Sequence, residues 1–132
     1  MYLLDTNACI RVLNDTSAPL VSRLRAEDPS AIRLSSVTKA ELLFGARHGT
    51  QATSNLRLLE RFFTPFLSLP FDDRCAEYCA ALRADLAGRG QLIGPNRMLI
   101  AATALAHDLV LVTHNTREFS RVVGLKIEDW ES

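Results

Sequence analysis

Short apolar runs alternate with amphipathic stretches along the 132-residue chain. Residues 2–4, 66–69 and 110–113 are apolar runs of strand length, and residues 32–34 are a plausible further strand. Residues 126–128 fit a short edge strand. Strands that alternate with helices are typical of an α/β domain with a mainly parallel central sheet.

Polar residues and prolines mark where the first predicted helices begin and end. Ser17 followed by Pro19 indicates a helix start. Thr38 and Glu41 have the spacing of a capping box, which predicts a helix that begins there and ends near residue 45 or 49. Residues 56–63 carry a helical apolar stripe that Pro65 ends.

Two further helices are expected in the second half. Asp72 or Asp73 can cap a helix from about residue 74 to residue 88 or 90. A turn at Gly94-Pro95-Asn96 precedes residues 98–105, which are nearly all apolar. A helix without a polar face must lie in the centre of the molecule.

Composition sets limits but does not identify a substrate. A hydrophobic content of 48% fits a single domain over residues 1–132. Fifteen basic and fifteen acidic residues give no net charge, which neither supports nor excludes an anionic partner. No apolar run approaches the length of a membrane span, and residues 1–5 lack a basic region and cleavage site. We therefore expect a cytoplasmic protein without a membrane partner.

Cysteine and histidine do not predict a metal site. The three cysteines are odd in number and lack a CxxC spacing, which argues against a disulfide framework and against zinc. Cys75 and Cys79 share a helical face with Tyr78, so we expect buried thiols. The histidines at positions 48, 107 and 114 are scattered, and we expect surface residues.

Oxygen-bearing side chains follow the predicted strands or start the next helix. Asp5 follows the first strand, Glu41 lies in a helix start, and Asn115 follows the fourth strand. Each has a structural alternative, because Asp5 and Asn115 can cap helices and Glu41 can bond back to the Thr38 amide. If the strand ends converge, the three form an oxygen donor set suited to Mg²⁺ or Mn²⁺, which activate water in phosphodiester cleavage.

Four segments of the chain have the sequence of known motifs: residues 2–7 (YLLDTN), 35–42 (SSVTKAEL), 93–102 (IGPN leading into LIAA) and 111–130 (LVTHNTREFSR, then GL and EDW). With these segments the chain resembles PIN-domain ribonuclease toxins of the VapC family, from type II toxin–antitoxin systems. The order and spacing of the segments extend over nearly the whole chain.

The resemblance implies a Rossmann-like α/β/α sandwich, a Mg²⁺ or Mn²⁺ site made by acids, and endonucleolytic cleavage of RNA. It also implies a VapB-type antitoxin that blocks the site, and a homodimer. By position, Asp5 and Glu41 match the first and second metal-binding acids. A later acid corresponds to Asn115 or Glu118. The residues expected to line the substrate site are Thr6, Thr113, Arg117 and Glu118.

One position departs from the resembled pattern. After Gly-Pro-Asn the family carries a catalytic aspartate, whereas this chain has Arg97. A positive charge should oppose a bound cation, so we expect Arg97 to reach Asp5 and Glu41, to take the cation's place and to impair cleavage. Natural degeneration, a sequence variant and deliberate inactivation are all open explanations.

Two other functions compete with the nuclease. One is a catalytically inactive PIN-like domain that binds an antitoxin or RNA. The other is a phosphatase with Asp5 as nucleophile, but the second aspartate expected two residues later is Asn7.

Two features of the surface bear on partners. Several apolar residues exceed what one small core is expected to hide, namely Leu42, Leu43, Phe44, Leu59, Phe62 and Phe63. Local cations could engage RNA despite the neutral net charge, the candidates being Lys39, Arg47, Arg117 and Arg121.

Overall fold

The computed structural model describes all residues, 1–132, around a five-stranded sheet. Every pairing in the sheet is parallel, and the strand order is β3-β2-β1-β4-β5. The strands are β1 (Tyr2–Leu4), β2 (Ile32–Ser35), β3 (Leu67–Leu69), β4 (Val110–Val112) and β5 (Ile127–Glu128). The mainly parallel α/β architecture predicted from the sequence is confirmed.

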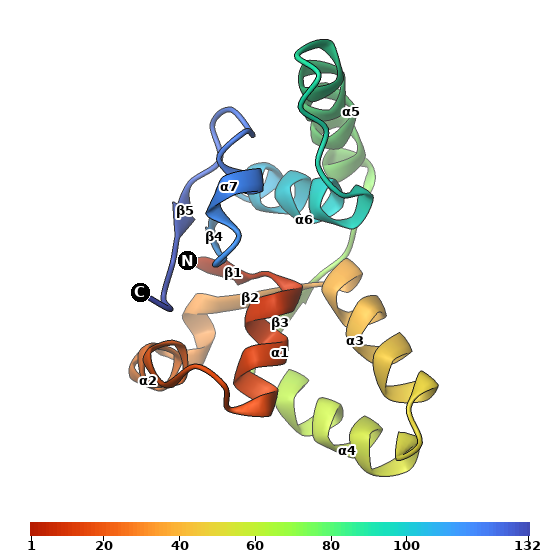
Figure 1. Ribbon diagram of the computed structural model, residues 1–132, viewed down its shortest axis with the longest axis vertical. Coiled ribbons are helices and arrows are strands. Elements are labelled where there is room, and N and C mark those ends of the chain that lie inside the picture. The colour runs from red at the N-terminus through yellow and green to blue at the C-terminus, as the bar shows by residue number, and fades with distance from the viewer.

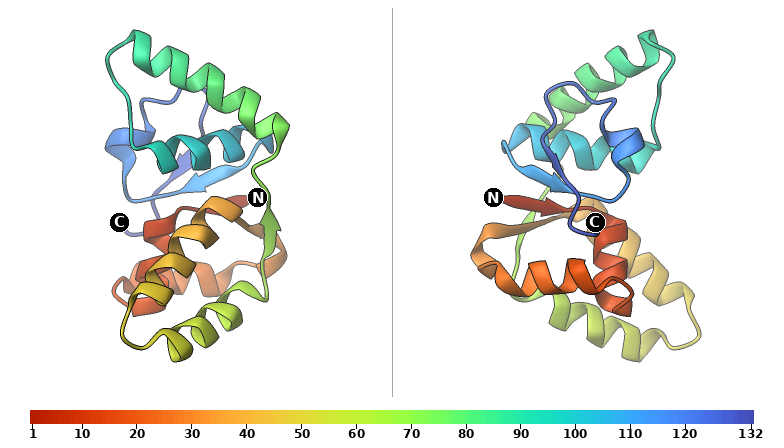
Figure 2. Two further views of the ribbon diagram at one scale, coloured as in Figure 1. Left: turned by 90° about the vertical axis from the view of Figure 1, so that its right-hand side faces the viewer. Right: turned by 60° about the vertical axis from the view of Figure 1, so that its left-hand side comes forward.

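Helices cover both faces of the sheet and give a three-layered sandwich (Figures 1 and 2). On one face lie α1 (Thr6–Asn14), α2 (Ala18–Ala26), α3 (Ser36–His48) and α4 (Ala52–Phe63). On the other lie α5 (Asp73–Gly88), α6 (Pro95–Ala106) and the short α7 (Thr116–Phe119). A 3₁₀ turn at Pro29–Ala31 leads into β2. No helix is both long and apolar enough to cross a membrane.

Alternation along the central strands divides the core into two clusters. Leu3 and Leu111 pack among α5, α6 and α7, whereas Leu4 and Val112 pack among the helices of the opposite face. Successive side chains of a strand point to opposite faces, and both faces of this sheet are covered. This explains why β1 and β4 read as continuous apolar runs.

The central helix expected over residues 98–105 is α6, which contributes seven buried residues. It begins at Pro95, so the predicted turn is only the entry to the helix and Asn96 lies in its first turn. Proline is favoured at this first position because its fixed φ suits the helix and its missing N–H would have no partner there.

The capping box predicted at Thr38 is wrong. Ser35 caps α3 instead, because its hydroxyl accepts the Thr38 amide at 3.1 Å, and the helix begins at Ser36. Thr38 is fully buried within the first turn. The caps expected at Ser17 and Asp72 are confirmed, and Gly49 follows the last residue of α3.

The predicted thiol burial holds only in part. Cys75 is buried and Cys79 is half-buried, while Tyr78 on the same turn is 39% exposed. Helix α5 packs mainly on α6, so its buried stripe is narrow. Burial raises the pKa of the Cys75 thiol. Burial also raises the pKa of the Cys9 thiol, more strongly, in the core cluster on the opposite face of the sheet.

The apolar residues that were expected to exceed the capacity of the core are only partly buried. Leu42 and Leu59 are buried, and Phe62 and Phe63 pack half-buried against the same cluster. Leu43 and Phe44 remain exposed on α3, with the Phe44 ring stacked on His48.

The tight packing of α6 predicts intolerance to added volume. Ala104 is fully buried in the cluster that α6 shares with α5 and the sheet. Ala104→Leu should lower the free energy of unfolding by about 1–3 kcal/mol, because extra methylenes force neighbours out of their rotamers. Urea denaturation measures this. Ala80→Leu on the exposed face of α5 is the matched control and should leave the midpoint unchanged.

Candidate active site

A cleft of about 280 Å³ lies where the carboxyl end of β1 meets the starts of α1 and α6. Strand β1 lies between β2 and β4, so the order of connections reverses on its two sides. Such a switch point is where open α/β sheets form their binding crevices. Ten residues line the cleft: Asp5, Thr6, Asn7, Glu41, Gly94, Pro95, Asn96, Arg97, Ile100 and Phe119.

Asp5 acts as a helix cap and also faces the cleft. Its backbone N–H donates to Val112 O at 3.1 Å, continuing the pairing of β1 with β4. Its Oδ1 accepts the Ala8 amide at 2.7 Å and so caps α1, and the residue is 4% exposed. The structural alternative weighed for Asp5 is therefore correct, and it does not remove the residue from the site.

Burial raises the pKa of the Asp5 carboxyl above its ordinary value. Hydrogen bonds from the Thr113 side chain and the Ala8 amide oppose that rise, as does the charge of Arg11, while Glu131 adds to it. Ionised Asp5 is thus less favourable in the folded protein than in water. Perturbed carboxyls of this kind gather at functional sites.

Glu41 is turned toward the cleft by threonine hydroxyls. The Thr6 hydroxyl donates to Glu41 Oε1 at 2.9 Å and lies 3.0 Å from the Thr38 hydroxyl. Because each hydroxyl has one hydrogen, Thr38 donates to Thr6 and Thr6 to the carboxylate. The bond from Glu41 back to the Thr38 amide, considered from the sequence, does not form, since that amide is bound to Ser35.

Arg97 lines the cleft but does not pair with its two acids. Its Nη1 donates to Glu118 Oε2 at 2.8 Å, and Asn115 Nδ2 donates to the same oxygen at 3.3 Å. Arg97 is also absent from the charges that shift the Asp5 pKa. The predicted pairing with Asp5 and Glu41 is therefore wrong. Arg97 pairs with Glu118 because the Glu118 side chain is more exposed and accessible. The Asp5 carboxylate is buried and already accepts hydrogen bonds.

The remaining predicted residues lie at different depths. Thr6 lines the cleft, whereas Thr113 does not line it and is hydrogen-bonded to Asp5 through its side chain. Asn115 and Glu118 are linked to the cleft through Arg97 and are not among its lining residues. Arg117 is exposed on α7, outside the lining.

Sequence reasoning did not identify Asn7 and Asn96 as cleft residues. Each lies in the first turn of a helix whose start forms the wall, α1 for Asn7 and α6 for Asn96. Both belong to segments already singled out, so their position beside the first strand and the glycine–proline turn was the available signal.

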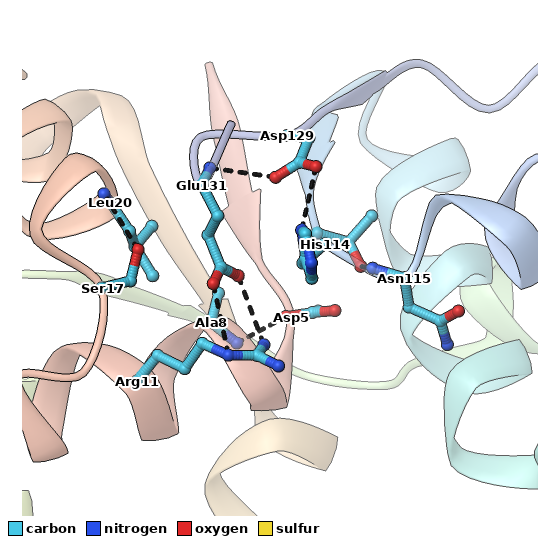
Figure 3. A network of polar contacts seen from close by, with 10 residues as sticks. Asp5, Ala8, Arg11, Ser17, Leu20, His114, Asn115, Asp129 and Glu131 are labelled. Atoms are coloured by element: carbon cyan, nitrogen blue, oxygen red, sulfur yellow. Dashed lines mark hydrogen bonds and ion pairs between the residues drawn. The ribbon is translucent and has the colours of Figure 1, made fainter.

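A polar network at the chain's end was also missed (Figure 3). His114, Asp129 and Glu131 form the only group of three histidine, cysteine or acidic side chains whose ligand atoms lie within 4.8 Å of one another. The expected surface position of His114 is correct, but its scattered place in the sequence did not predict that it joins such a group. His107 is half-buried rather than a surface residue, and its Nε2 is buried without a partner.

The acids of this network already have protein partners. Asp129 accepts the Glu131 amide at 2.9 Å and faces His114 Nδ1 at 3.0 Å. Arg11 reaches both oxygens of Glu131 at 3.2 Å. The network therefore ties the C-terminal residues to α1 and to the end of β4, beside Asp5.

The donors of the cleft are of the type that hard cations prefer. Asp5 and Glu41 offer carboxylate oxygens, and Asn7 and Asn96 offer amide oxygens. No thiol or imidazole lines the cleft, so the donor set suits Mg²⁺ or Mn²⁺ better than zinc. Only two acids line the cleft, and Glu118, which lies outside the lining, is paired with Arg97.

The burial of Asp5 predicts that the site reduces stability. Asp5→Asn keeps a good helix cap and removes the buried charge, so its free energy of unfolding at pH 7 should equal or exceed that of the parent. The folded-state pKa is raised, so any advantage of asparagine is present above that pKa and shrinks as pH falls toward 3.8. Asp5→Ala, which loses the cap, should be about 1 kcal/mol less stable than Asp5→Asn. Denaturation at several pH values measures both, and a marked loss in Asp5→Asn would contradict this account.

The chain is similar to known proteins along nearly its whole length. The model of the PIN domain family matches residues 2–125. The chain is 37% identical to the tRNA(fMet)-specific endonuclease VapC of Shigella flexneri over 129 residues, which covers 98% of this chain and 97% of the relative. It is 35% identical to ribonuclease VapC2 of Haemophilus influenzae, with the same coverage of both chains.

Solved structures show the same fold. The DNA-bound VapBC of Salmonella typhimurium superposes with a TM-score of 0.92 at 35% identity, covering 98% of this chain and 97% of the other. VapBC2 of Rickettsia felis, bound to a promoter DNA fragment, gives 0.91 at 32% identity, covering 98% of each chain. The chain belongs to the PIN-domain family and, within it, to the VapC ribonucleases of toxin–antitoxin systems.

Proposed function

We propose that this chain is the toxin of a VapBC-type pair and an endoribonuclease that uses Mg²⁺ or Mn²⁺ at Asp5 and Glu41. The observation that carries the proposal is that these two acids line one cleft, although Asp5 caps α1 and Glu41 lies in α3. The names of its relatives, an endonuclease specific for tRNA(fMet) and several ribonucleases, support RNA as the substrate.

The protein's own residues prepare the acids for this work. The Ala8 amide and the Thr113 side chain hold Asp5, which favours its ionised form against the effect of burial. The Thr6 hydroxyl fixes Glu41 beside it. A divalent cation bound there would lower the pKa of a water molecule and would place positive charge next to the scissile phosphate. Asn7 and Asn96 offer amides with which the substrate can be oriented.

Arg97 weakens this site without filling it. It occupies the position of an expected aspartate and pairs with Glu118, so the cation has two acids rather than a larger set. A positive side chain in the same cleft also repels a divalent ion. We propose that the chain cleaves RNA with reduced efficiency. A catalytically inactive binding domain is the second candidate, and Arg97 is the observation that favours it.

An RNA cleavage assay in Mn²⁺ tests the nuclease. Asp5→Asn and Glu41→Gln should each lower the cleavage rate by about 100-fold or more, as expected when a group of the catalytic centre is removed, and EDTA should abolish cleavage. Arg97→Asp should raise the rate and lower the Mn²⁺ concentration needed by about tenfold or more. Arg25→Asp makes the same charge change in the exposed last turn of α2, outside the cleft, and should have little effect.

The outcomes separate the candidates. Cleavage that depends on Asp5 in the parent supports the reduced nuclease. Cleavage that appears only in Arg97→Asp supports an inactive domain descended from one. Cleavage that survives in Asp5→Asn and Glu41→Gln contradicts the assignment of the site.

A second cavity supports an antitoxin as partner. It measures about 430 Å³, is bordered by α1, α3 and α4, and has six hydrophobic residues among ten. Ile10 and Leu58 are exposed along it. Glu41 lines both this groove and the cleft, so a peptide lying in the groove would reach the acids and block them. The neighbours solved as VapBC complexes support a segment of the antitoxin as the occupant.

This predicts which apolar residue the antitoxin needs. Leu58→Arg should weaken binding of the purified cognate antitoxin by about tenfold or more, because a charge replaces an apolar contact in the groove. Val123→Arg is the control, since Val123 is 77% exposed and lies outside the groove. Isothermal titration calorimetry compares them, and equal losses in both variants would place the antitoxin elsewhere.

A further inference from the structure

Arg97 is the only cationic side chain among the ten residues that line the cleft. The cations suggested by the sequence do not line it. Lys39 lies over the Phe63 ring with its Nζ 4.8 Å from the centroid, and Arg121 donates to Leu92 O. Arg47 and Arg117 are exposed elsewhere. An anionic substrate that enters this cleft meets its positive charge at Arg97.

The Arg97 side chain is held in place while part of its guanidinium remains free. Its Nη1 donates to Glu118. The Arg97 side chain also lies close to Gly94, since a Cβ added to that glycine would be 3.4 Å from Nη1. Neither Nε nor Nη2 has a hydrogen-bond partner in the protein, and the side chain is 41% exposed. A guanidinium has five N–H donors in a fixed fork that matches the oxygens of phosphate.

We propose that Arg97 is a phosphate-binding site, which holds a phosphodiester of the RNA backbone beside Asp5 and Glu41. This inference rests on the proposed function and adds how the substrate is held. Glu118 orients the guanidinium and leaves donors for the phosphate. The first turn of α6, which lines the same cleft without a side-chain cap, adds a potential of the same sign.

A purely structural role explains the pair less well. Arg97 and Glu118 are 41% and 28% exposed, and ion pairs this open to solvent contribute little to stability. The pair does connect α6 to α7, so loss of Arg97 must be separated from loss of folding. Thermal unfolding of each variant provides that check, and we expect unchanged midpoints.

The proposal makes one substitution act in opposite directions on two ligands. Arg97→Asp should bind Mn²⁺ more tightly, because it removes a repelling charge and adds an oxygen donor. The same variant should bind RNA more weakly when no divalent ion is present, because the phosphate loses its partner. The tighter Mn²⁺ binding follows from the charge change alone, so the discriminating variant is Arg97→Gln: a residue that only connects α6 to α7 would leave RNA binding unchanged in that variant.

The test is fluorescence anisotropy with a 2′-O-methyl single-stranded RNA, which resists cleavage, in EDTA over a range of NaCl concentrations. Arg97→Gln should lower the affinity by about tenfold and reduce the slope of log K against log salt by about 0.7, the loss of one phosphate contact on a single strand. Arg97→Lys should keep most of the slope, since it keeps the charge. Arg25→Gln removes an exposed cation in the last turn of α2, outside the cleft, and should change the affinity by less than about twofold.

Equal affinities and slopes for the parent, Arg97→Gln and Arg25→Gln would overturn the proposal, as would a parent that does not bind this RNA. Failure of the nuclease proposal looks different, because it appears as RNA cleavage that does not depend on Asp5 or is absent even in Arg97→Asp. The binding assay in EDTA does not depend on cleavage, so the two failures are distinguishable.

Discussion

The pairing of β1 with both β2 and β4 is the constraint on which the rest of the structure depends. Leu3 and Leu4 are completely buried on opposite faces, so this three-residue strand contributes to both core clusters. The same pairing sets Asp5 at the switch point of the sheet, with its amide bonded to Val112. Everything that converges on the cleft, including Glu41 from α3 and Arg97 from α6, does so around the end of this strand.

Asp5 joins stability and chemistry in one side chain. Its carboxylate caps α1 and thereby fixes the direction in which the chain leaves the sheet. Its burial also makes the ionised form unfavourable, which a residue selected only as a cap would avoid. Asparagine caps equally well without charge, so the capping role alone does not require the buried acid at position 5, which supports the proposed cation site.

The sequence predicted the elements whose signals are local. The apolar runs of β1 and β4, the caps at Ser17 and Asp72 and the central α6 needed only neighbouring residues to be recognised. The α1 helix was not predicted, although Asp5 was recognised as a possible cap. Polar residues in its first turn, Thr6 and Asn7, resemble loop composition there, and their role becomes clear only when Glu41 and α6 are in place.

Contacts between distant segments could not be predicted. Thr38 has the local sequence of a cap, but Ser35 at the end of β2 supplies that hydroxyl and Thr38 is buried instead. Arg97 was expected to turn to the cleft acids, yet Glu118 from α7 lies within hydrogen-bonding distance. Asp129 and Glu131 approach His114 only because β5 pairs with β4 and returns the chain's end to the sheet.

The central claim, that Asp5 and Glu41 hold a divalent cation, is tested most directly by anomalous scattering from crystals of the parent and of Arg97→Asp grown with Mn²⁺. This account predicts an anomalous peak between the Asp5 and Glu41 carboxylates in Arg97→Asp, and a weaker peak at the same place in the parent. It would be contradicted if neither crystal held manganese there, above all if the ion lay instead among His114, Asp129 and Glu131.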